Sequence, residues 1–343
     1  MGFFEPGTRC LLVAEVGQSH DGSLGTAHAY IDAAVNAGAD VIKFQTHLAE
    51  AESHPSEPWR VHFSKQDATR YDYWKRMEFT PQEWAGLYDH CHEKGVLFAS
   101  SPFSLEAVSL LQQTGIDIWK VASGEVTNTT LLDEIASDGR PTFLSTGMST
   151  TDEIDRAVST LRDRCETIAL LQCTSRYPCP PEDLNLSVMR ELHELYGLPA
   201  GLSDHSGTIF GGLMAATLGA RVIEVHVTLS REAFGPDVTS SITFTELATL
   251  RQGLDFIHQA SGSQKTKNAT ADELLHVRSL FTKSLVTRRD VPKGSVLQPD
   301  DLTAKKPGNG IPADKIGSVI GRVVTRDLGT NEILQLSDLT DPE

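Results

Sequence analysis

The stretch GLSDHSGTIFGGLMAATLGARVIEVHVTL, residues 201–229, decides the fold of this chain. It predicts a buried strand, an amphipathic helix closed by a glycine, and a second buried strand. His205 and His226 stand at the ends of these two strands, and an acidic residue closely precedes each of them. The rest of the sequence must explain why two successive strands both end in a histidine.

The same strand and helix unit recurs along the chain. The segments NAGADVIKFQ, EKGVLFASS, QTGIDIWKVASGE and TLGARVIEVH each place a glycine before an apolar run and a polar group after it. Looser versions are CLLVAEVG, RPTFLSTG, ETIALLQCT and LPAGLSDH. Apolar residues at most positions indicate strands that are buried on both faces. The strands are expected at roughly residues 10–16, 40–45, 96–101, 117–122, 141–145, 167–173, 199–203 and 221–226.

Eight alternations of strand and helix over about 260 residues fit a (β/α)8 barrel, the TIM-barrel fold, in number and in length. A doubly wound open sheet is the alternative, but no GxGxxG motif follows the first strand. We therefore predict a catalytic TIM barrel over residues 1–262. Residues 46–80, between the second and third strands, are rich in His, Pro, Trp and Arg and are expected to form a long loop over one end of the barrel.

The composition changes after the barrel. The segment SGSQKTKNATADE is polar and predicts a linker, which we place at residues 263–283. Residues 284–343 contain short β-like runs and turn residues, with few helical stretches. They predict a second, small, β-rich domain.

Bulk properties exclude several classes of protein. A net charge of −16 argues against nucleic-acid binding. The sequence lacks an apolar run of about 18 residues, so a membrane span is not expected. The N-terminal MGFFEPGTRC lacks the pattern of a signal peptide, and five cysteines without CxxC spacing suit reduced thiols. We therefore expect a cytoplasmic protein that binds neither nucleic acid nor membrane.

The catalytic residues of a TIM barrel lie at the C-terminal ends of its strands, and all the predicted strand ends carry polar side chains. Lys43 and Lys120 are the most informative, because a lysine inside an apolar strand must pair with an anion or lie at the mouth of the barrel. A single serine or threonine can equally be a helix cap. The other polar residues at these ends are Glu15, Gln45, Ser100, Ser101, Ser123, Glu125, Ser145, Thr146, Thr174, Ser175, Tyr177, Ser203, Asp204 and Glu224.

The two histidines predict a metal site. Neighbouring strands lie about 4.8 Å apart, so residues at equivalent levels of the last two strands can share one ion. Two imidazoles with water suit Mn²⁺, Fe²⁺, Co²⁺ or Zn²⁺ better than Mg²⁺ alone. The alternative is that His205 caps the following helix and that His226 is a core histidine.

A series of motifs resembles one known family. AEVGQSHDGSL, KFQT, SPF, KVASGE, STGMS, CTSRYP, GLSDHSG, VIEVHVTL and FGPDVTSSI follow one another as in the sialic acid synthases (N-acetylneuraminate synthases). The C-terminal region resembles the antifreeze-like (SAF) domain that ends members of that family. The resemblance implies a transferase that condenses phosphoenolpyruvate with the open-chain aldehyde of N-acetylmannosamine or a related hexose. The products would be a nine-carbon 2-keto sugar acid and phosphate.

The resemblance also assigns roles to individual residues. The metal, Mn²⁺ with Mg²⁺ or Co²⁺ as alternatives, would be held by His205 and His226. Glu15 or Glu125 would act as general base. The phosphoenolpyruvate site would consist of Lys43, Lys120, Ser123, Ser145 and Ser203. Facing the sugar and the reacting carbons would be Glu15, Gln45, Glu125, Tyr177 and Asp237.

The chain departs from the family pattern at several positions. Ser175 stands where asparagine is common, and Lys306, in KKPGNGI, stands where the family has an arginine that reaches the acyl group of the sugar. A lysine does not reproduce the forked donor of an arginine, so we expect an altered acceptor. In the family, the tail domain covers the barrel mouth of the partner subunit, which implies a domain-swapped homodimer. The other departures are Ser19, Asp21, Val225 and Val238.

Two other functions fit parts of the sequence. A Schiff-base aldolase would also use a barrel lysine, either Lys43 or Lys120, but it would not need two histidines on a metal. A non-catalytic sugar-binding or ice-binding protein would use the antifreeze-like tail. It would not explain why the lysines and the histidines occur together.

Overall fold

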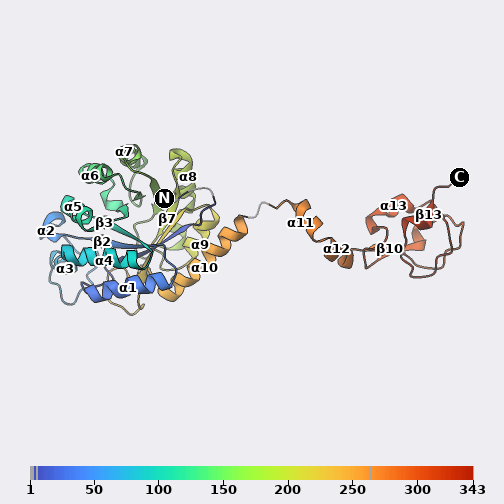
Figure 1. Cartoon of the computed structure of the whole chain (residues 1–343), viewed down its shortest axis with the longest axis horizontal. Coiled ribbons are helices and arrows are strands. Elements are labelled where there is room, and N and C mark those ends of the chain that lie inside the picture. Colours follow the sequence, from blue (N-terminus) through green and yellow to red (C-terminus); the bar gives the residue numbers. More distant parts are fainter. Residues whose placement is uncertain (1–3, 5–6, 263–264, 343) are drawn as a thin grey trace. The chain divides into compact units, whose positions relative to one another are not determined.

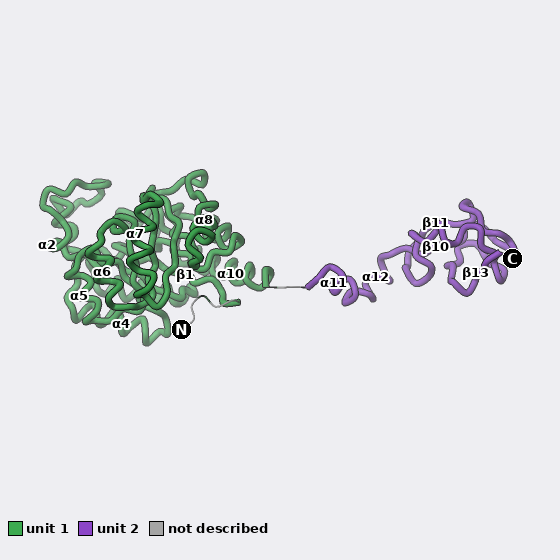
Figure 2. The backbone as a smooth tube through the Cα atoms, turned by 90° about the horizontal axis from the view of Figure 1, so that it is seen from above, with its two compact units in different colours: residues 1–262 green, residues 263–343 purple. Residues whose placement is uncertain are grey.

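The computed structural model describes residues 4, 7–262 and 265–342. The chain divides into two compact units, residues 1–262 and 263–343, which Figure 2 shows in green and purple. Among the described residues, no helix is long and apolar enough to cross a membrane.

The first unit is a closed barrel of parallel strands. The strands pair in chain order and β8 pairs with β1, which completes the ring. The closed ring confirms the TIM barrel and rules out the doubly wound sheet. Figure 1 shows the strands inside a ring of helices. The strands are β1 (Leu11–Gly17), β2 (Val41–Thr46), β3 (Leu97–Pro102), β4 (Ile118–Val121), β5 (Thr142–Ser145), β6 (Ile168–Cys173), β7 (Ala200–Asp204) and β8 (Val222–Thr228), with a short β9 (Ser241–Thr243) beside β8.

The strands are buried on both faces, as their composition predicts. Every residue of β8 is buried. One apolar cluster of buried residues is drawn from strands alone and includes Val13, Phe143 and Val222, which is the composition of a filled barrel interior. A larger cluster joins the strands to the surrounding helices.

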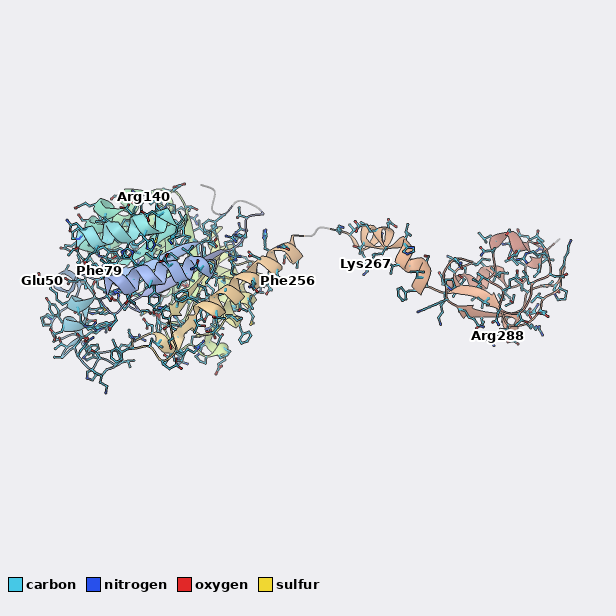
Figure 3. All side chains as sticks on the ribbon, turned by 60° about the horizontal axis from the view of Figure 1, so that its bottom comes forward. Glu50, Phe79, Arg140, Phe256, Lys267 and Arg288 are labelled. Atoms are coloured by element: carbon cyan, nitrogen blue, oxygen red, sulfur yellow. The ribbon has the colours of Figure 1, made fainter. Side chains whose placement is uncertain are left out.

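Helices with strong local end signals separate the strands. Thr80 and Glu83 form a capping box at the start of α4, with Pro81 in the first turn. Gly38 and Gly219, which precede apolar strands, have positive φ angles, as a glycine that closes a helix does. Phe256 lies on the exposed side of α10 (Figure 3). The helices are α1 (Leu24–Asn36), α4 (Pro81–Glu93), α5 (Leu105–Thr114), α6 (Thr129–Asp138), α7 (Thr151–Arg162), α8 (Leu186–Tyr196), α9 (Phe210–Thr217) and α10 (Phe244–Ser261), with the 3-10 turns η1 (Ser123–Glu125), η2 (Pro181–Asp183) and η3 (Val238–Ser240).

Residues 46–80, which we call the β2–β3 segment, differ from the expected loop. They contain two helices, α2 (Ala49–Glu52) and α3 (Arg70–Met77), and buried Tyr73, Trp74 and Met77 form a small cluster apart from the main core. The prediction of one long loop over residues 46–80 is therefore wrong in part. The segment folds because its aromatic residues pack on one another.

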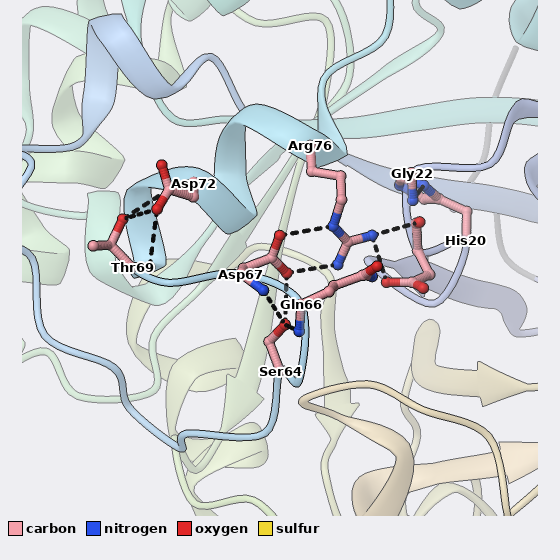
Figure 4. Close-up of polar contacts among 9 residues, drawn as sticks. His20, Gly22, Ser64, Gln66, Asp67, Thr69, Asp72 and Arg76 are labelled. Atoms are coloured by element: carbon pink, nitrogen blue, oxygen red, sulfur yellow. Dashed lines mark hydrogen bonds and ion pairs between the residues drawn. The ribbon is translucent and has the colours of Figure 1, made fainter.

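Arg76 fastens this segment to the barrel. Its guanidinium donates to both carboxylate oxygens of Asp67, at 2.9 and 2.8 Å. It also donates to the carboxylate and the carbonyl oxygen of Asp21, each at 2.8 Å. Figure 4 shows Arg76 between Asp67 and the turn at His20 and Gly22. Asp21 is one of the departures from the family pattern, and in this chain it anchors the β2–β3 segment.

The second unit contains two small antiparallel sheets. β10 (Ser284–Thr287) pairs with β11 (Leu302–Lys305), and β12 (Val323–Val324) pairs with β13 (Leu339–Thr340). A separate apolar core includes Leu285. Two short helices, α11 (Lys267–Glu273) and α12 (Leu275–Phe281), lie where a linker is expected at residues 263–283, and the unit also has α13 (Ile316–Val319) and the turns η4 (Pro299–Asp301), η5 (Ala313–Lys315) and η6 (Leu336–Asp338).

Candidate active site

Charged side chains meet inside the barrel at the C-terminal ends of its strands. Strand pairing sets Glu15 opposite Lys43 of β2 and opposite His226 of β8. Ser203 of β7 stands opposite Glu224 of β8. The group that we call the floor consists of Glu15, Lys43, Lys120, Ser145, Ser203 and Glu224, all of them buried.

Ion pairs join the two lysines of the floor through one carboxylate. Lys43 Nζ lies 2.6 Å from Glu15 Oε2 and 3.8 Å from Glu224 Oε1. Lys120 Nζ lies 3.7 Å from the same Glu224 oxygen. Burial disfavours the charged form of Lys43, but Glu15 and Glu224 outweigh it and raise its pKa. Burial lowers the pKa of Lys120, in spite of Glu224. The two lysines therefore sit in different electrostatic environments.

Hydroxyl groups complete the floor. Lys120 Nζ donates to Ser145 Oγ at 2.6 Å, and Ser203 Oγ donates to Glu224 Oε1 at 2.9 Å. Ser123, in the turn after β4, has its hydroxyl 3.0 Å from the thiol of Cys173. The floor thus offers ammonium groups and hydroxyls together, which is a donor set suited to phosphate and carboxylate.

His205 and His226 are neighbours, with ring centroids 5.4 Å apart. The Nδ1 atom of His205 lies 2.8 Å from the carbonyl oxygen of Thr174, to which it can only donate. This contact leaves Nε2 with its lone pair. Burial, together with His226, lowers the pKa of His205 to about 4, so the ring is neutral at neutral pH. A neutral His205 ring with the Nε2 lone pair available is the form of histidine that binds metals.

The described part of the chain has no group of three or more His, Cys, Asp and Glu side chains that could hold a metal. Within the described residues, the candidate metal ligands at this site are the imidazoles of His205 and His226. Tyr177 stacks on His205 at 4.1 Å between ring centroids. This stacking keeps the His205 ring in place.

A cavity of about 440 Å³ opens above the floor. Gln45 connects the two, because its Nε2 donates to Glu15 Oε1 at 2.7 Å. Residues of the β2–β3 segment form much of the lining, including Trp59, Arg60 and Trp74. The predicted site residues that line the cavity are Gln45, Ser123, Glu125, Ser175, Tyr177, His226 and Asp237.

Glu125 and Asp237 reach the cavity from different elements. Glu125 ends the turn η1, and burial raises its pKa although Asn128 donates to it at 2.8 Å. Asp237 lies just before η3 and accepts from Arg60 at 2.6 Å. The Arg60 guanidinium also covers the ring of Tyr177 at 4.4 Å.

One predicted site residue lies outside the barrel unit. Lys306 belongs to the second unit, where its ammonium group lies 5.0 Å from the ring centroid of Phe281. Its predicted contact with the sugar remains a proposal.

Several polar residues of the site had no role assigned from the sequence. Glu224 was noted at its strand end, and it precedes His226 by two positions, so strand alternation places both side chains on one face. Arg60 and the pair of His47 and Glu52 belong to the β2–β3 segment. The sequence carried no local signal for these residues, because distant contacts position them.

Two protein-family models match this chain. The model of the NeuB family matches residues 30–266, and that of the SAF domain matches residues 282–340. N,N'-diacetyllegionaminic acid synthase of Campylobacter jejuni is 33% identical over 95% of this chain and 99% of that protein. Human N-acetylneuraminate-9-phosphate synthase is 33% identical over 92% of this chain and 88% of its own length.

A solved structure agrees with these relatives. The N-acetylneuraminic acid synthetase of Leptospira borgpetersenii, crystallised with citrate, superposes with a TM-score of 0.69 at 32% identity. The match covers 79% of this chain and 92% of that one. The chain therefore belongs to the NeuB family and ends in a SAF domain.

Proposed function

We propose that this protein condenses phosphoenolpyruvate with the open-chain aldehyde of N-acetylmannosamine or a related hexose. The products are a nine-carbon 2-keto sugar acid and phosphate. The observation that carries the proposal is the floor, in which two buried lysines and several hydroxyls lie beside His205 and His226. Relatives named as synthases of legionaminic, neuraminic and pseudaminic acids support this reaction class.

The floor and the neighbouring Ser123 bind phosphoenolpyruvate in this proposal. Lys43 and Lys120 neutralise its phosphate and carboxylate, and the hydroxyls of Ser123, Ser145 and Ser203 donate hydrogen bonds. Lys120 is the freer of the two ammonium groups, because its nearest carboxylate oxygen lies at 3.7 Å. Lys43 is held by Glu15 at 2.6 Å and is correspondingly fixed in position.

His205 and His226 hold a divalent metal, for which Mn²⁺ is the proposed ion and Mg²⁺ or Co²⁺ the alternatives. Such an ion supplies Lewis acidity that polarises the aldehyde of the acceptor. The contact of His205 with Thr174 fixes the tautomer that leaves Nε2 available. Tyr177 keeps the ring in place by stacking.

The bond changes follow from the two substrates. The enol carbon of phosphoenolpyruvate attacks the aldehyde carbon, and one C–C bond forms. Water then adds to C2, which has become cationic, and phosphate leaves with cleavage of its C–O bond. Glu125 is the better placed of the two proposed bases, because it lines the cavity and burial raises its pKa. Glu15 is engaged by Lys43 and Gln45.

Gln45, Tyr177 and Asp237 face the acceptor, and Ser175 and Lys306 distinguish this chain from the usual pattern. Because Lys306 lacks the fork of an arginine, we propose weak use of N-acetylmannosamine and a preference for a differently substituted acceptor. The domain-swapped homodimer, which would bring Lys306 to the cavity of the partner, stays a prediction. The cysteines are all free, which suits the proposed cytoplasmic location.

Phosphate release tests this function. The full-length protein with Mn²⁺ and phosphoenolpyruvate should release phosphate only when an acceptor from a panel of amino and neutral hexoses is present. A Schiff-base aldolase would instead be trapped covalently on Lys43 or Lys120 by borohydride in the presence of substrate. A non-catalytic sugar-binding protein would bind a sugar without releasing phosphate.

A further inference from the structure

One side of the cavity is built from apolar side chains. This apolar wall consists of Trp59, Val61, Phe63, Tyr73, Trp74 and Phe103, all of which line the cavity. Phe63 meets Tyr73 edge to face, with ring centroids 5.1 Å apart, and Trp59 meets Phe63 in the same way at 5.6 Å. The wall is thus a packed surface that a ligand with apolar groups would extend.

The cations around this wall already have partners. Arg60 donates to Asp237 at 2.6 Å, and Arg70 lies 3.2 Å from Glu57. These guanidinium groups and their carboxylates all line the cavity. An anionic substituent would have to displace a carboxylate from each pair and would then lie beside it.

His47 is paired in the same way. Its Nδ1 atom contacts Glu52 Oε1 at 2.5 Å. The ring lies between Trp74 and Phe103, with centroid distances of 3.9 and 4.3 Å. Glu125 adds a further carboxylate to the lining. The surroundings of the apolar wall therefore hold at least as much negative as positive charge.

The floor also holds two carboxylates beside its two lysines, but it differs in how Lys120 is held. The nearest contact of the Lys120 ammonium group is the hydroxyl of Ser145 at 2.6 Å, and its nearest carboxylate oxygen lies at 3.7 Å. An anion bound in the floor could therefore pair with this ammonium group without breaking a hydrogen-bonded ion pair. Binding of anions thus belongs to the floor, and the apolar wall is left for an uncharged group.

We infer that the acceptor is an uncharged hexose whose carbons far from the aldehyde carry apolar substituents, such as a deoxy methyl or an acyl group, and carry no phosphate. The inference rests on the proposed function, since it names the acceptor class of that reaction. It places the apolar substituents against the apolar wall and the phosphate of phosphoenolpyruvate on the floor.

Binding of matched sugars tests the inference independently of turnover. Trp59 and Trp74 line the cavity, so their fluorescence should report a bound sugar. The full-length protein with Mn²⁺ is titrated with N-acetylmannosamine, its 6-deoxy analogue and its 6-phosphate. The expected result is that the 6-deoxy sugar binds at least as tightly as the parent, and that the 6-phosphate binds at least tenfold more weakly. Equal or tighter binding of the 6-phosphate would overturn the inference.

A variant pair sharpens the test. Glu57→Gln removes the charge that neutralises Arg70, while its amide oxygen can still accept from Trp74 Nε1, now 3.0 Å from the carboxylate. The discrimination against the 6-phosphate should shrink several-fold. Glu50→Gln is the matched control, because Glu50 is 78% exposed on α2 and is absent from the described lining (Figure 3). Equal discrimination in the two variants would contradict the charge argument.

Phosphate release from phosphoenolpyruvate, measured on the same samples, separates the two claims. Selective binding of uncharged sugars without phosphate release would leave the acceptor inference standing and refute the proposed reaction. Phosphate release with the 6-phosphate as the preferred acceptor would support the reaction and refute the inference.

Discussion

The apolar wall lines the cavity, whereas the floor lies beneath it and is joined to the lining by Gln45, and the two are built in different ways. The floor comes from strand ends, and the strand register sets Glu15 against Lys43 and Ser203 against Glu224. The apolar wall comes mostly from the β2–β3 segment, which is packed on itself and fastened by Arg76. Because Arg76 fixes this segment to the barrel, substitutions elsewhere in the segment need not alter the barrel. The reaction is therefore expected to reside in the floor and the histidines, and the choice of acceptor in the wall.

Removal of the metal should have the largest effect on phosphate release. The proposed metal site lies beside the floor. Treatment with EDTA should abolish phosphate release, and Mn²⁺ or Co²⁺ should restore it, because the proposed Lewis acid is then absent or present. His226→Ala should lose both metal and activity while the protein remains folded, whereas exposed His258→Ala should change neither. Full activity in metal-stripped protein would eliminate the metal from the account.

Loss of the proposed base should come next. Glu125→Gln should lower kcat by roughly 10²- to 10⁴-fold, the usual contribution of general acid–base catalysis. Because burial raises the pKa of Glu125, wild-type kcat should fall with acidification at a higher pH than an ordinary glutamate would produce. This acid limb should disappear in Glu125→Gln. A limb at the same pH in the variant would assign it to another group.

A substitution within the floor should cost less. Lys120→Met removes one charge-assisted contact with phosphoenolpyruvate, worth about 1.5–3 kcal/mol, which corresponds to a fall in kcat/KM of ~10- to 150-fold. Metal binding should be unchanged. Lys43→Met should lower activity as well, and it should also destabilise the fold, because Glu15 would lose its closest partner. Unchanged kinetics in both variants would remove the lysines from the mechanism.

A substitution that alters binding of the acceptor sugar should change kcat/KM by a smaller factor. Lys306→Arg should raise kcat/KM for N-acetylmannosamine by roughly tenfold, about one charge-assisted hydrogen bond. The kinetics of phosphoenolpyruvate should stay constant, since the floor is intact. If wild type already uses N-acetylmannosamine as well as any other acceptor, and Lys306→Arg gains nothing, the altered-acceptor proposal is wrong.

The smallest effect concerns the junction where the β2–β3 segment meets the barrel. Burial lowers the pKa of His20 to about 3, while an unfolded histidine titrates near pH 6.5. The unfolded chain therefore binds the extra proton first, and stability should be complete above pH 6.5 and decline on acidification toward pH 3. In His20→Phe, the fall in Tm between pH 6.5 and pH 4 should be smaller by a few degrees. Exposed His258→Phe should retain the wild-type slope.

Sequence patterns sufficed for the barrel because its signals are local. Glycines such as Gly219 close helices, apolar runs follow them, and the predicted strands agree with the observed ones to within about two residues, as for β8. The polar strand ends that meet in the floor were found for the same reason. The combined role of Glu224, which links both lysines, needed the register between strands.

The β2–β3 segment could not be deduced in this way. Its fold depends on Arg76 reaching Asp21 and on aromatic contacts between residues far apart in the segment. Arg60 contacts Asp237 across 177 positions of the sequence. The helices α11 and α12 were also missed. The sequence of α11, KNATADE, is polar, and neither helix has a buried residue.

The central claim is most directly tested by the fate of one oxygen atom. Phosphoenolpyruvate is labelled with ¹⁸O at the oxygen that bridges C2 and phosphorus, and is incubated with the full-length protein, Mn²⁺ and an acceptor sugar. The account predicts that phosphate appears in step with the keto acid, only when the acceptor is present, and that the label is found in the phosphate. Label retained in the organic product, or phosphate released without an acceptor, would contradict it.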